Sequence, residues 1–406
     1  MWEQIAANRR KSFVLVAGAA LLLAALGWAL GEYFGGQGAG PGGVAVALAV
    51  WFVMTMVAWR QGDQVFLTMS GAKKVKDGDL PQLRNVVEEM TLAAGLPRVP
   101  DIYVIDDEAP NAFATGRRPE TAAVAVTSGL LKTLNRDELQ GVIAHEIAHV
   151  RNRDILLMLF AGVLAGAIVI LAEVGLRGMW FGGGRSRSRR DGDGGGQGII
   201  ALIAVVLMIV APIIAQLIYF AVSRKREYLA DASAASFTRY PEGLAAALEK
   251  IAASPRKLAS ANSATAPMYI INPLKRAGKA AANATSTHPP IDERVRILRA
   301  MGRSSFAAYD EAFRQVKGGR RGVVPGSALA EEKEAAVRGA SGDGPVLRDD
   351  PLRRERARQV DDFIYRADGW QRIECPCGTV LKLPADFAAP RARCPRCGRV
   401  HNLQGD

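Results

Sequence analysis

The stretch "GVIAHEIAHVRNRDILLMLFAGVLAG" occupies residues 141–166 and joins two distinct features. His145 and His149 lie four residues apart with Glu146 between them, and an apolar run begins soon afterwards at Ile155. Residues i and i+4 share one face of a helix, so both imidazoles can bind one metal ion. The run that follows is long enough to enter a membrane. The stretch therefore predicts a metal site at the edge of a membrane.

Four apolar runs have the length of membrane-crossing helices, which need about 17 to 25 residues. They cover residues 13–30, 43–59, 155–172 and 199–222. The first two predict an N-terminal transmembrane hairpin over residues 1–59. A secretory signal is the alternative for the first run, but no convincing small-residue cleavage site precedes a mature domain. Four transmembrane helices are therefore expected.

Basic residues near the first two runs predict their orientation. Arg9, Arg10 and Lys11 precede the first run and Arg60 follows the second, whereas the loop between the runs has no Lys or Arg. Because basic flanks tend to stay in the cytoplasm, we expect the N-terminus and the region after residue 59 to be cytoplasmic. Such flanks also account for much of the net charge of +12, so no nucleic acid partner is expected.

An Arg-rich segment, "GGGRSRSRRDGDGGGQG" at residues 182–198, separates the third and fourth runs. Two full crossings would place this segment outside, against the tendency of basic loops to stay inside. A hairpin that stays within protein or dips into the membrane is the alternative. We expect two crossings, because the two runs would otherwise need a large protein surface to cover them.

The rest of the chain predicts a mainly helical structure with a small β-sheet, an α+β fold. Residues 81–95 predict an amphipathic helix with Pro in its first turn and Gly at its end. Three short β-prone stretches follow, at residues 101–105, 111–116 and 122–127. Asn135 and Glu138 then have the spacing of a capping box, which begins the helix that carries both histidines.

His145, Glu146 and His149 form the H-E-x-x-H pattern of zinc metallopeptidases. The two imidazoles would bind the metal, and the glutamate could contact an attacking water without binding the metal itself. A helix with incidental polar residues is the alternative. Glu227 is the candidate third ligand, and Asp231 follows one turn later, where it could hold the free N–H of a ligating histidine. This E-x-x-x-D pair is weak by itself, since such pairs usually form a solvated helix face.

Four ordered motifs resemble the HtpX family of membrane-bound zinc metallopeptidases, relatives of the type I CAAX prenyl endopeptidases. The motifs are "NAFATG", "HEIAHVRNRD", "SRKREYLADASAA" and "THPPIDER", and the resemblance covers residues 1–300 approximately. It implies a zincin-like catalytic domain of the gluzincin type, with His145, His149 and Glu227 as zinc ligands and Glu146 as the catalytic base. It also implies an edge strand that pairs with an extended substrate, formed by Asn111, Ala112, Phe113 and Ala114.

The ligand set predicts peptide hydrolysis without a covalent intermediate. Glu146 takes a proton as water attacks the scissile carbonyl, and it then hands that proton to the leaving amine. His288, in "THPPIDER", could support the oxyanion or cap the open zinc position. A structural role in the turn before two prolines is the alternative for this histidine.

The four cysteines of the chain lie close together near its C-terminus, at Cys375, Cys377, Cys394 and Cys397. Two knuckles, each ending in Gly, match a four-cysteine zinc ribbon that holds a structural zinc ion. The first knuckle is C-x-C rather than the usual C-x-x-C. Two disulfides are the alternative, disfavoured because the tail is expected in the reducing cytoplasm. A redox C-x-x-C is weaker still, since it lacks a βαβ context.

The predicted organisation has four parts. They are the transmembrane hairpin (1–59), the metallopeptidase domain with two embedded apolar helices at 155–172 and 199–222 (60–316), a flexible linker (317–365) and the zinc ribbon (366–406). The linker prediction rests on a mixture of Gly, Ala and charged residues with few large apolar ones.

We therefore expect an integral membrane zinc endopeptidase with one catalytic and one structural zinc ion. The resemblance suggests membrane protein quality control, with damaged or misassembled membrane proteins as substrates. We expect the protein in the bacterial inner membrane. The basic flanks predict that the N-terminus, the active site and the C-terminus lie in the cytoplasm, and the ribbon could bind a protein partner. The alternatives are a membrane-tethered zinc-binding scaffold and a processing protease for lipidated peptides. Glu146 argues against the scaffold, because a structural zinc site needs no base.

Overall fold

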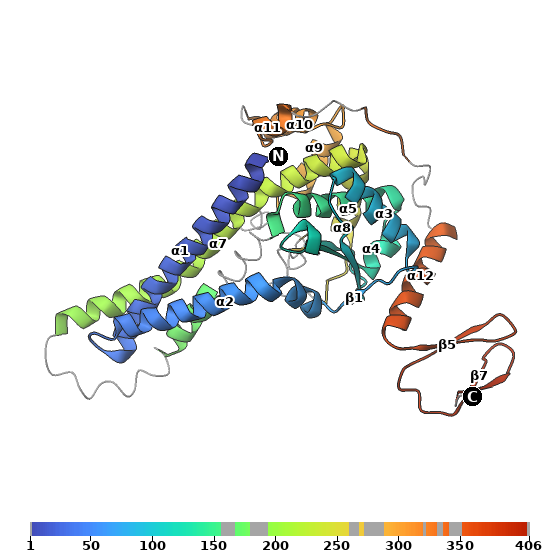
Figure 1. Ribbon diagram of the computed structural model, residues 1–406, viewed down its shortest axis with the longest axis horizontal. Helices are drawn as coiled ribbons and strands as arrows, with labels where there is room; N and C mark the ends of the chain where they lie inside the picture. Colours follow the sequence, from blue (N-terminus) through green and yellow to red (C-terminus); the bar gives the residue numbers. More distant parts are fainter. Residues whose placement is uncertain are drawn as a thin grey trace.

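The molecule consists of a helical arm, a mixed α and β body and a small C-terminal pair of hairpins (Figure 1). The computed structural model describes residues 2–155, 167–178, 194–259, 268–271, 288–319, 322–330, 336–340 and 351–403. Helices dominate, and the strands of the described residues form one four-stranded sheet and two hairpins. The predicted mainly helical fold with a small sheet is confirmed.

Three long helices form the arm. Helix α1 (Trp2–Gly35) and helix α2 (Gly40–Met69) form a hairpin, and helix α7 (Gly194–Thr238) runs beside α1 (Figure 1). Small residues allow α1 and α2 to approach closely, since a Cβ added at Gly27 would lie 2.6 Å from the Cβ of Ala47. Any larger residue at this position would push the two helices apart.

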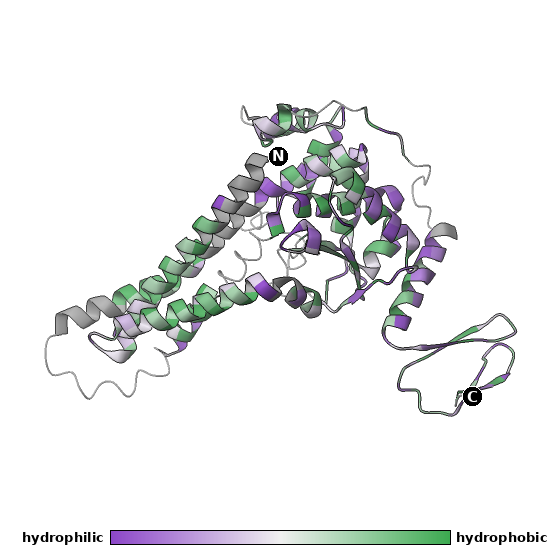
Figure 2. Cartoon of the chain, viewed as in Figure 1, coloured by the Kyte–Doolittle hydropathy of each residue, from purple (hydrophilic) through white to green (hydrophobic). Residues whose placement is uncertain are grey.

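The arm exposes large apolar side chains. Phe13 and Leu21 on α1 are 75% and 74% exposed, and Leu202 on α7 is 64% exposed. Figure 2 shows the same contrast along the molecule, with mostly hydrophobic helices in the arm and many hydrophilic residues in the body. So much exposed apolar surface is unfavourable in water and is typical of a surface that contacts lipid or another protein.

Two helical segments among the described residues are long and apolar enough to cross a membrane, Val16–Gly35 and Gly40–Val57. They correspond to the first two predicted runs. The apolar part of α7, Leu202–Ile214, is shorter. Of the third run, residues 156–166 lie outside the described residues, and helical residues 167–178 pack against α1 and α7. The described chain thus contains two candidate spans where the sequence predicts four.

The body contains a four-stranded sheet with the order β1-β2-β4-β3. Its strands are β1 (Ala72–Lys74), β2 (Asp101–Ile105), β3 (Ala112–Thr115) and β4 (Ala123–Thr127). Strands β2 and β4 run parallel, whereas β1 and β3 run antiparallel to their neighbours. β3 is the last strand in this order, so one of its edges faces away from the sheet. The last three strands lie where the sequence predicts them.

Helices of different lengths complete the body. They are α3 (Pro81–Ala94), the 3-10 helix η1 (Pro119–Thr121), α4 (Ser128–Thr133), α5 (Arg136–Arg151), α8 (Pro241–Ala253), α9 (Ile291–Arg299), α10 (Phe306–Lys317) and α11 (Gly326–Ala330). Helix α5 is central, because it contacts α3, α7, α8 and β3. Its apolar residues Val142, Ile143 and Ile147 have no exposed surface.

Both ends of α5 are defined by specific residues. The Asn135 side chain accepts the N–H of Glu138, and the Glu138 carboxylate accepts the N–H of Asn135, so the predicted capping box is present. At the other end Asn152 caps the helix and Arg153 has a φ of 55°. A non-glycine residue in this left-handed region interrupts a right-handed helix. The helix with the histidines therefore ends before the apolar run.

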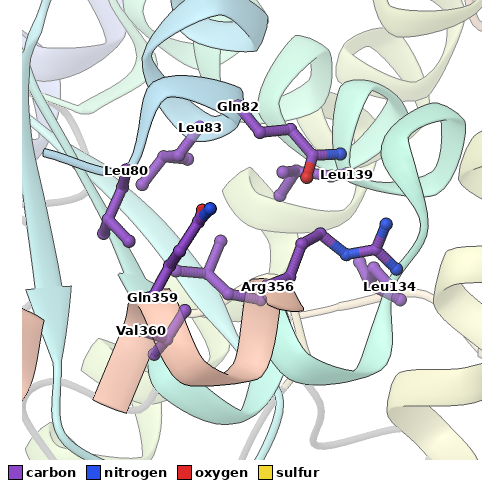
Figure 3. A pocket seen from close by; sticks show the side chains of 9 residues that line it. Leu80, Gln82, Leu83, Leu134, Leu139, Arg356, Gln359 and Val360 are labelled. Carbon is purple, nitrogen blue, oxygen red and sulfur yellow. The ribbon is translucent and has the colours of Figure 1, made fainter. Parts of the chain in front are cut away.

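Helix α12 (Pro351–Ala367) packs on the body and leads to the C-terminal hairpins. Its residues Val360, Phe363 and Ile364 belong to the main hydrophobic core. Figure 3 shows Val360 and Gln359 facing leucines of the body across a pocket. The leucines that line this pocket are Leu80, Leu83, Leu131, Leu134 and Leu139.

Ion pairs hold α12 against the body. Lys132 lies 2.6 Å from Asp361, and Lys73 lies 2.6 Å from Asp368 just beyond the helix. The range predicted as a flexible linker, residues 317–365, thus includes most of a helix that is packed on the core.

The C-terminal segment forms two antiparallel hairpins. Strand β5 (Gln371–Glu374) pairs with β6 (Val380–Leu383), and β7 (Arg391–Arg393) pairs with β8 (Val400–Asn402). Lys382 of β6 lies 2.8 Å from Asp362 of α12, which ties the first hairpin to that helix.

Candidate metal centre

Helices α5 and α7 bring the three predicted metal ligands together. The Nε2 atoms of His145 and His149 lie 3.2 Å apart. Glu227 reaches both, with Oε2 at 3.7 Å from His145 Nε2 and Oε1 at 3.4 Å from His149 Nε2. Ligands at ordinary zinc bond lengths in a tetrahedron are about 3.3 Å apart. The two nitrogens and one carboxylate therefore fit a single zinc ion.

A carboxylate holds the second nitrogen of each histidine. His145 Nδ1 lies 2.9 Å from Asp231 Oδ1, and His149 Nδ1 lies 3.1 Å from Asp154 Oδ2. These contacts fix the ring orientation and leave each Nε2 directed at the centre. The sequence predicts the partner role of Asp231, but it does not predict that of Asp154. The turn at Arg153 after α5 places Asp154 beside His149.

Arg294 of α9 is a further member of the site that the sequence does not reveal. Its side chain is fully buried and donates two hydrogen bonds to the Asp231 carboxylate, from Nε at 2.8 Å and from Nη2 at 2.7 Å. Its Nη1 donates to the carbonyl of Ile270 at 3.4 Å. Arg294 belongs to "THPPIDER", so its motif is visible in the sequence, but its contact with a residue 63 positions earlier depends on the fold.

His288 lies beside the carboxylate ligand. Its Nδ1 is 2.7 Å from Oε2 of Glu227, and its side chain is buried. The structure thus brings His288 into the centre, in a position to orient Glu227.

The centre is rich in buried negative charge. Burial alone would raise the pKa of Glu227, but His288, His145 and His149 hold that pKa well below its usual value. Burial alone would lower the pKa of His149, but hydrogen bonds to Asp154 and Glu227 outweigh it and raise the pKa to about 10. Carboxylates that attract protons to buried imidazoles are equally suited to a divalent cation, which would take the place of those protons.

The candidate ligands His145, His149 and Glu227 form what we call the metal cluster, and Glu146 lines the cavity that contains them. Burial raises the pKa of its carboxyl group, while the neighbouring histidines and the backbone N–H of Ala114 lower it by a smaller amount. A raised pKa makes this carboxylate a stronger base. Glu146 therefore combines a position at the cluster with the basicity that proton transfer requires.

The predicted substrate strand lies beside the same cavity. Ala112, Phe113 and Ala114 form β3, and Asn111 directly precedes it. Ala114 lines the cavity together with Ile155 and the metal cluster. All the residues predicted for catalysis, metal binding and substrate pairing in this part of the chain are thus brought to one place.

The four cysteines form a second cluster, far from the first along the chain. Cys375 Sγ lies 3.4 Å from Cys397 Sγ, and Cys377 Sγ lies 3.7 Å from Cys394 Sγ. All four are free thiols rather than disulfides. Zinc–sulfur bonds in a tetrahedron place the sulfurs about 3.8 Å apart, so the cluster fits one zinc ion. The knuckle glycines, with φ values of 82° and 75°, provide the left-handed turns that bring the sulfurs together.

A family model and sequence relatives point to the same group of proteases. The family model for peptidase family M48 matches residues 79–302. A "Protease HtpX homolog" of Dictyoglomus thermophilum is 45% identical over 301 residues, which cover 74% of this chain and 95% of that protein. Another from Syntrophobacter fumaroxidans is 47% identical over 283 residues, covering 69% of this chain and 97% of that protein. The crystal structure of S. mikatae Ste24p aligns with 73% of this chain and 66% of its own, at 19% identity and a TM-score of 0.39.

Proposed function

The chain belongs to peptidase family M48, and from this premise we propose that it is a membrane-anchored zinc endopeptidase of the HtpX type. The membership confirms the resemblance expected from the four sequence motifs. The observation that carries the proposal is the convergence of His145, His149 and Glu227 next to Glu146 in one cavity. A metallopeptidase requires such a constellation, with three ligands and a base.

We infer that the metal is zinc, held by His145, His149 and Glu227. Two imidazoles and one carboxylate at tetrahedral spacing are a donor set that zinc prefers. When bound, zinc would supply Lewis acidity, which polarises the scissile carbonyl and makes water acidic. The carboxylates of Asp231 and Asp154 would orient the two histidines, and His288 would orient Glu227.

Glu146 would act as the general base and then as the general acid. Its carboxylate takes a proton from the water that attacks the scissile carbonyl carbon, and it gives that proton to the leaving amine. The raised pKa of Glu146 suits both halves of this exchange, because the group holds the proton more readily than an exposed glutamate does. An oxyanion or zinc-capping role for His288 remains a second hypothesis, and its short contact with Glu227 favours the orienting role.

The substrates would be extended protein segments, paired with β3. The two candidate spans support substrates in or near a membrane. A role in the quality control of membrane proteins is proposed from the resemblance of the four sequence motifs, not from the geometry. Processing of lipidated peptides would use the same catalytic residues. A zinc-binding scaffold is disfavoured, because Glu146 has no use at a purely structural site.

The predicted topology and organisation complete the proposal. The N-terminus, the active site and the C-terminus would be cytoplasmic, in a bacterial inner membrane. Two further crossings by residues 155–172 and 199–222 would complete four spans. The predicted boundary at residue 316 lies at the end of α10, whereas those at residues 59 and 365 fall inside α2 and α12. The cysteine cluster would hold a structural zinc, with its hairpins available to a protein partner.

Replacement of Glu146 by Gln tests the catalytic assignment. Gln is nearly the same size but cannot accept the proton, so we expect cleavage of an unfolded protein by the purified enzyme to fall by about 10²- to 10⁴-fold. The zinc content should stay unchanged, because Glu146 is not a ligand.

Glu138→Gln is the matched control. Glu138 lies on the same helix and is also buried, but it belongs to the capping box, where Gln can replace Glu. This variant should cleave like the wild type. If Glu146→Gln retains cleavage while zinc is bound, the proposed mechanism is wrong.

A further inference from the structure

A short segment of the chain lies on the edge of β3 where a substrate would pair. We call residues Met268–Ile271 the strap. The backbone N–H of Ile270 donates to the carbonyl of Ala112 at 2.9 Å. Asn111 Oδ1 and Nδ2 face Ile271, and Nδ2 donates to its carbonyl at 2.9 Å. The strap is thus bound by a backbone and a side-chain hydrogen bond of the kind that an incoming peptide would make.

The register of β3 shows that the strap lies on the edge of β3 that faces away from β4. Thr127 of β4 donates its N–H to the carbonyl of Asn111, so residue 111 is directed at β4. Backbone groups alternate along an antiparallel strand, and those of Ala112 and Ala114 therefore point away from the sheet. Ile270 uses the carbonyl of Ala112, and the N–H of Ala114 interacts with Glu146. The Ala112 carbonyl and the Ala114 N–H on this edge are therefore engaged from within the chain.

Side chains anchor the strap in the same position. The Tyr269 ring packs edge-on against Phe113 with ring centroids 5.2 Å apart, and neither Tyr269 nor Ile270 has exposed surface. Arg294 donates to the carbonyl of Ile270 and also holds Asp231 of the metal centre. The strap is therefore attached both to the strand and to the framework of the metal cluster.

The strap also closes the metal cluster. Met268, Tyr269 and Ile270 line the cavity that contains the three ligands and Glu146. The exposed fractions of His145, Glu146 and Glu227 are only 1%, 2% and 1%. A peptide bond cannot reach Glu146 while the strap occupies this place. The conformation described is thus closed with respect to a polypeptide substrate.

We propose that the strap is an internal occupant of the substrate edge, which a substrate must displace before it can be cleaved. This inference rests on the proposed peptidase function and specifies its regulation. The three buried strap side chains are Met, Tyr and Ile, so the space they leave suits apolar side chains. The substrate that replaces the strap is an extended apolar segment, which folded water-soluble proteins rarely expose and membrane or unfolded proteins provide.

Ile270→Pro is the specific test, with Ile270→Ala as its control. Both variants lose the large side chain, but only Pro removes the N–H that bonds to Ala112. A net hydrogen bond corresponds to about a fivefold change in an equilibrium constant. We expect kcat/KM for an unfolded substrate to be about fivefold higher in Ile270→Pro than in Ile270→Ala. An equal or lower value in Ile270→Pro would mean that this hydrogen bond does not hold the strap against the substrate, and would overturn the proposal.

A binding measurement separates this inference from the catalytic proposal. The probe is a fluorescent peptide that copies residues 267–272, "PMYIIN", and the host is full-length protein with Glu146→Gln. We expect tighter binding, by about fivefold, when Tyr269→Ala removes from the strap the ring that packs against Phe113, because the peptide keeps its own Tyr. A peptide with Pro in place of its first Ile should bind more weakly, because it lacks the N–H for Ala112.

Each outcome of the pair of measurements has one meaning. Tighter peptide binding in Tyr269→Ala without any cleavage by the wild type would support the strap proposal and refute the peptidase assignment. Cleavage by the wild type with unchanged or weaker peptide binding in Tyr269→Ala would support the peptidase assignment and refute the strap proposal. Because Tyr269→Ala keeps every backbone N–H of the strap, this measurement holds even where Ile270→Pro fails to fold.

Discussion

Arg294 is the residue that most directly compensates the buried negative charge of the metal centre. It has no exposed surface, and its guanidinium makes a bidentate pair with Asp231, which in turn holds His145. A buried carboxylate without such a partner would be strongly disfavoured. The contacts of Arg294 with Asp231 and of Asp231 with His145 therefore connect α9 to a proposed metal ligand on α5.

Arg294→Lys should weaken zinc binding while keeping the positive charge. Lys cannot form the planar bidentate pair, so Asp231 and His145 would be held less firmly. Loss of such a supporting contact typically costs about 10- to 100-fold in metal affinity. Competition against a chelator measures this directly in the purified protein.

Arg299→Lys provides the comparison on the same helix. Arg299 is partly exposed and pairs with Glu242 and Glu249 away from the metal centre. The zinc affinity of the Arg299→Lys variant should therefore match that of the wild type. Equal zinc affinity in Arg294→Lys and Arg299→Lys would show that Arg294 does not position the ligands.

The residues of the site differ in how far the sequence could predict them. His145, Glu146 and His149 depend only on helix periodicity, which is local, and they are therefore visible as a pattern. Asp154 and Arg294 act through contacts that arise from a left-handed turn and from the packing of α9, respectively. No local spacing encodes such contacts, and so they appear only in the folded chain.

Among the elements, helix α12 shows how a helix can be missed. Val360, Phe363 and Ile364 have the i, i+3, i+4 spacing of a buried helical face. Charged residues surround them in the sequence, so the hydrophobic periodicity of this stretch is weak. The packing against Leu83 and Leu134 of the body provides the stability that the composition does not indicate. Strands β2, β3 and β4 were easier to predict, because short β-branched and apolar stretches lie between turn residues.

The cysteine hairpins should bind zinc independently of the active site. Four thiolates at tetrahedral spacing leave no open position, so the ion would be structural. Mutating Cys394 and Cys397 together to Ser should reduce the zinc content from about two to about one ion per chain. Elemental analysis of the purified protein measures the number of zinc ions per chain.

His401→Ala tests whether the ligand set is complete. His401 lies on β8, close to the cysteine cluster in the sequence, but the four cysteines already provide a complete set of zinc ligands. This variant should retain about two zinc ions. A double Cys variant that still holds two ions would refute the second zinc site.

At the scale of the whole molecule, α7 joins the arm to the catalytic body. It has 45 residues, and at 1.5 Å per residue it is about 68 Å long, roughly twice the thickness of a hydrocarbon core. Its apolar part lies in the arm, and its other end carries Glu227 and Asp231. One continuous helix thus connects the arm to the proposed third metal ligand. The sequence indicates the apolar run and the ligand pair, but a continuous helix through both depends on residues between them that have no distinctive pattern.

The membrane arrangement is the part of the fold that composition predicts least completely. Hydropathy identifies α1 and α2 as candidate spans because their length and composition alone suffice. The 167–178 helix and α7 bury part of their apolar surface against α1. An apolar composition is therefore found where helices pack together as well as where they are exposed. Apolar content therefore does not by itself give the number of crossings.

The central claim is that one zinc ion at His145, His149 and Glu227 makes this chain a peptidase, and a zinc titration tests it most directly. Of the two candidate metal clusters among the described residues, metal-free protein with Cys394 and Cys397 replaced by Ser keeps only this one. Cleavage of an unfolded protein should start from a negligible rate, rise with added zinc and level off at about one equivalent per chain. The same titration with Glu227→Gln should leave cleavage at least about 100-fold lower. Cleavage by the metal-free protein, or full activity with Glu227→Gln, would contradict the account.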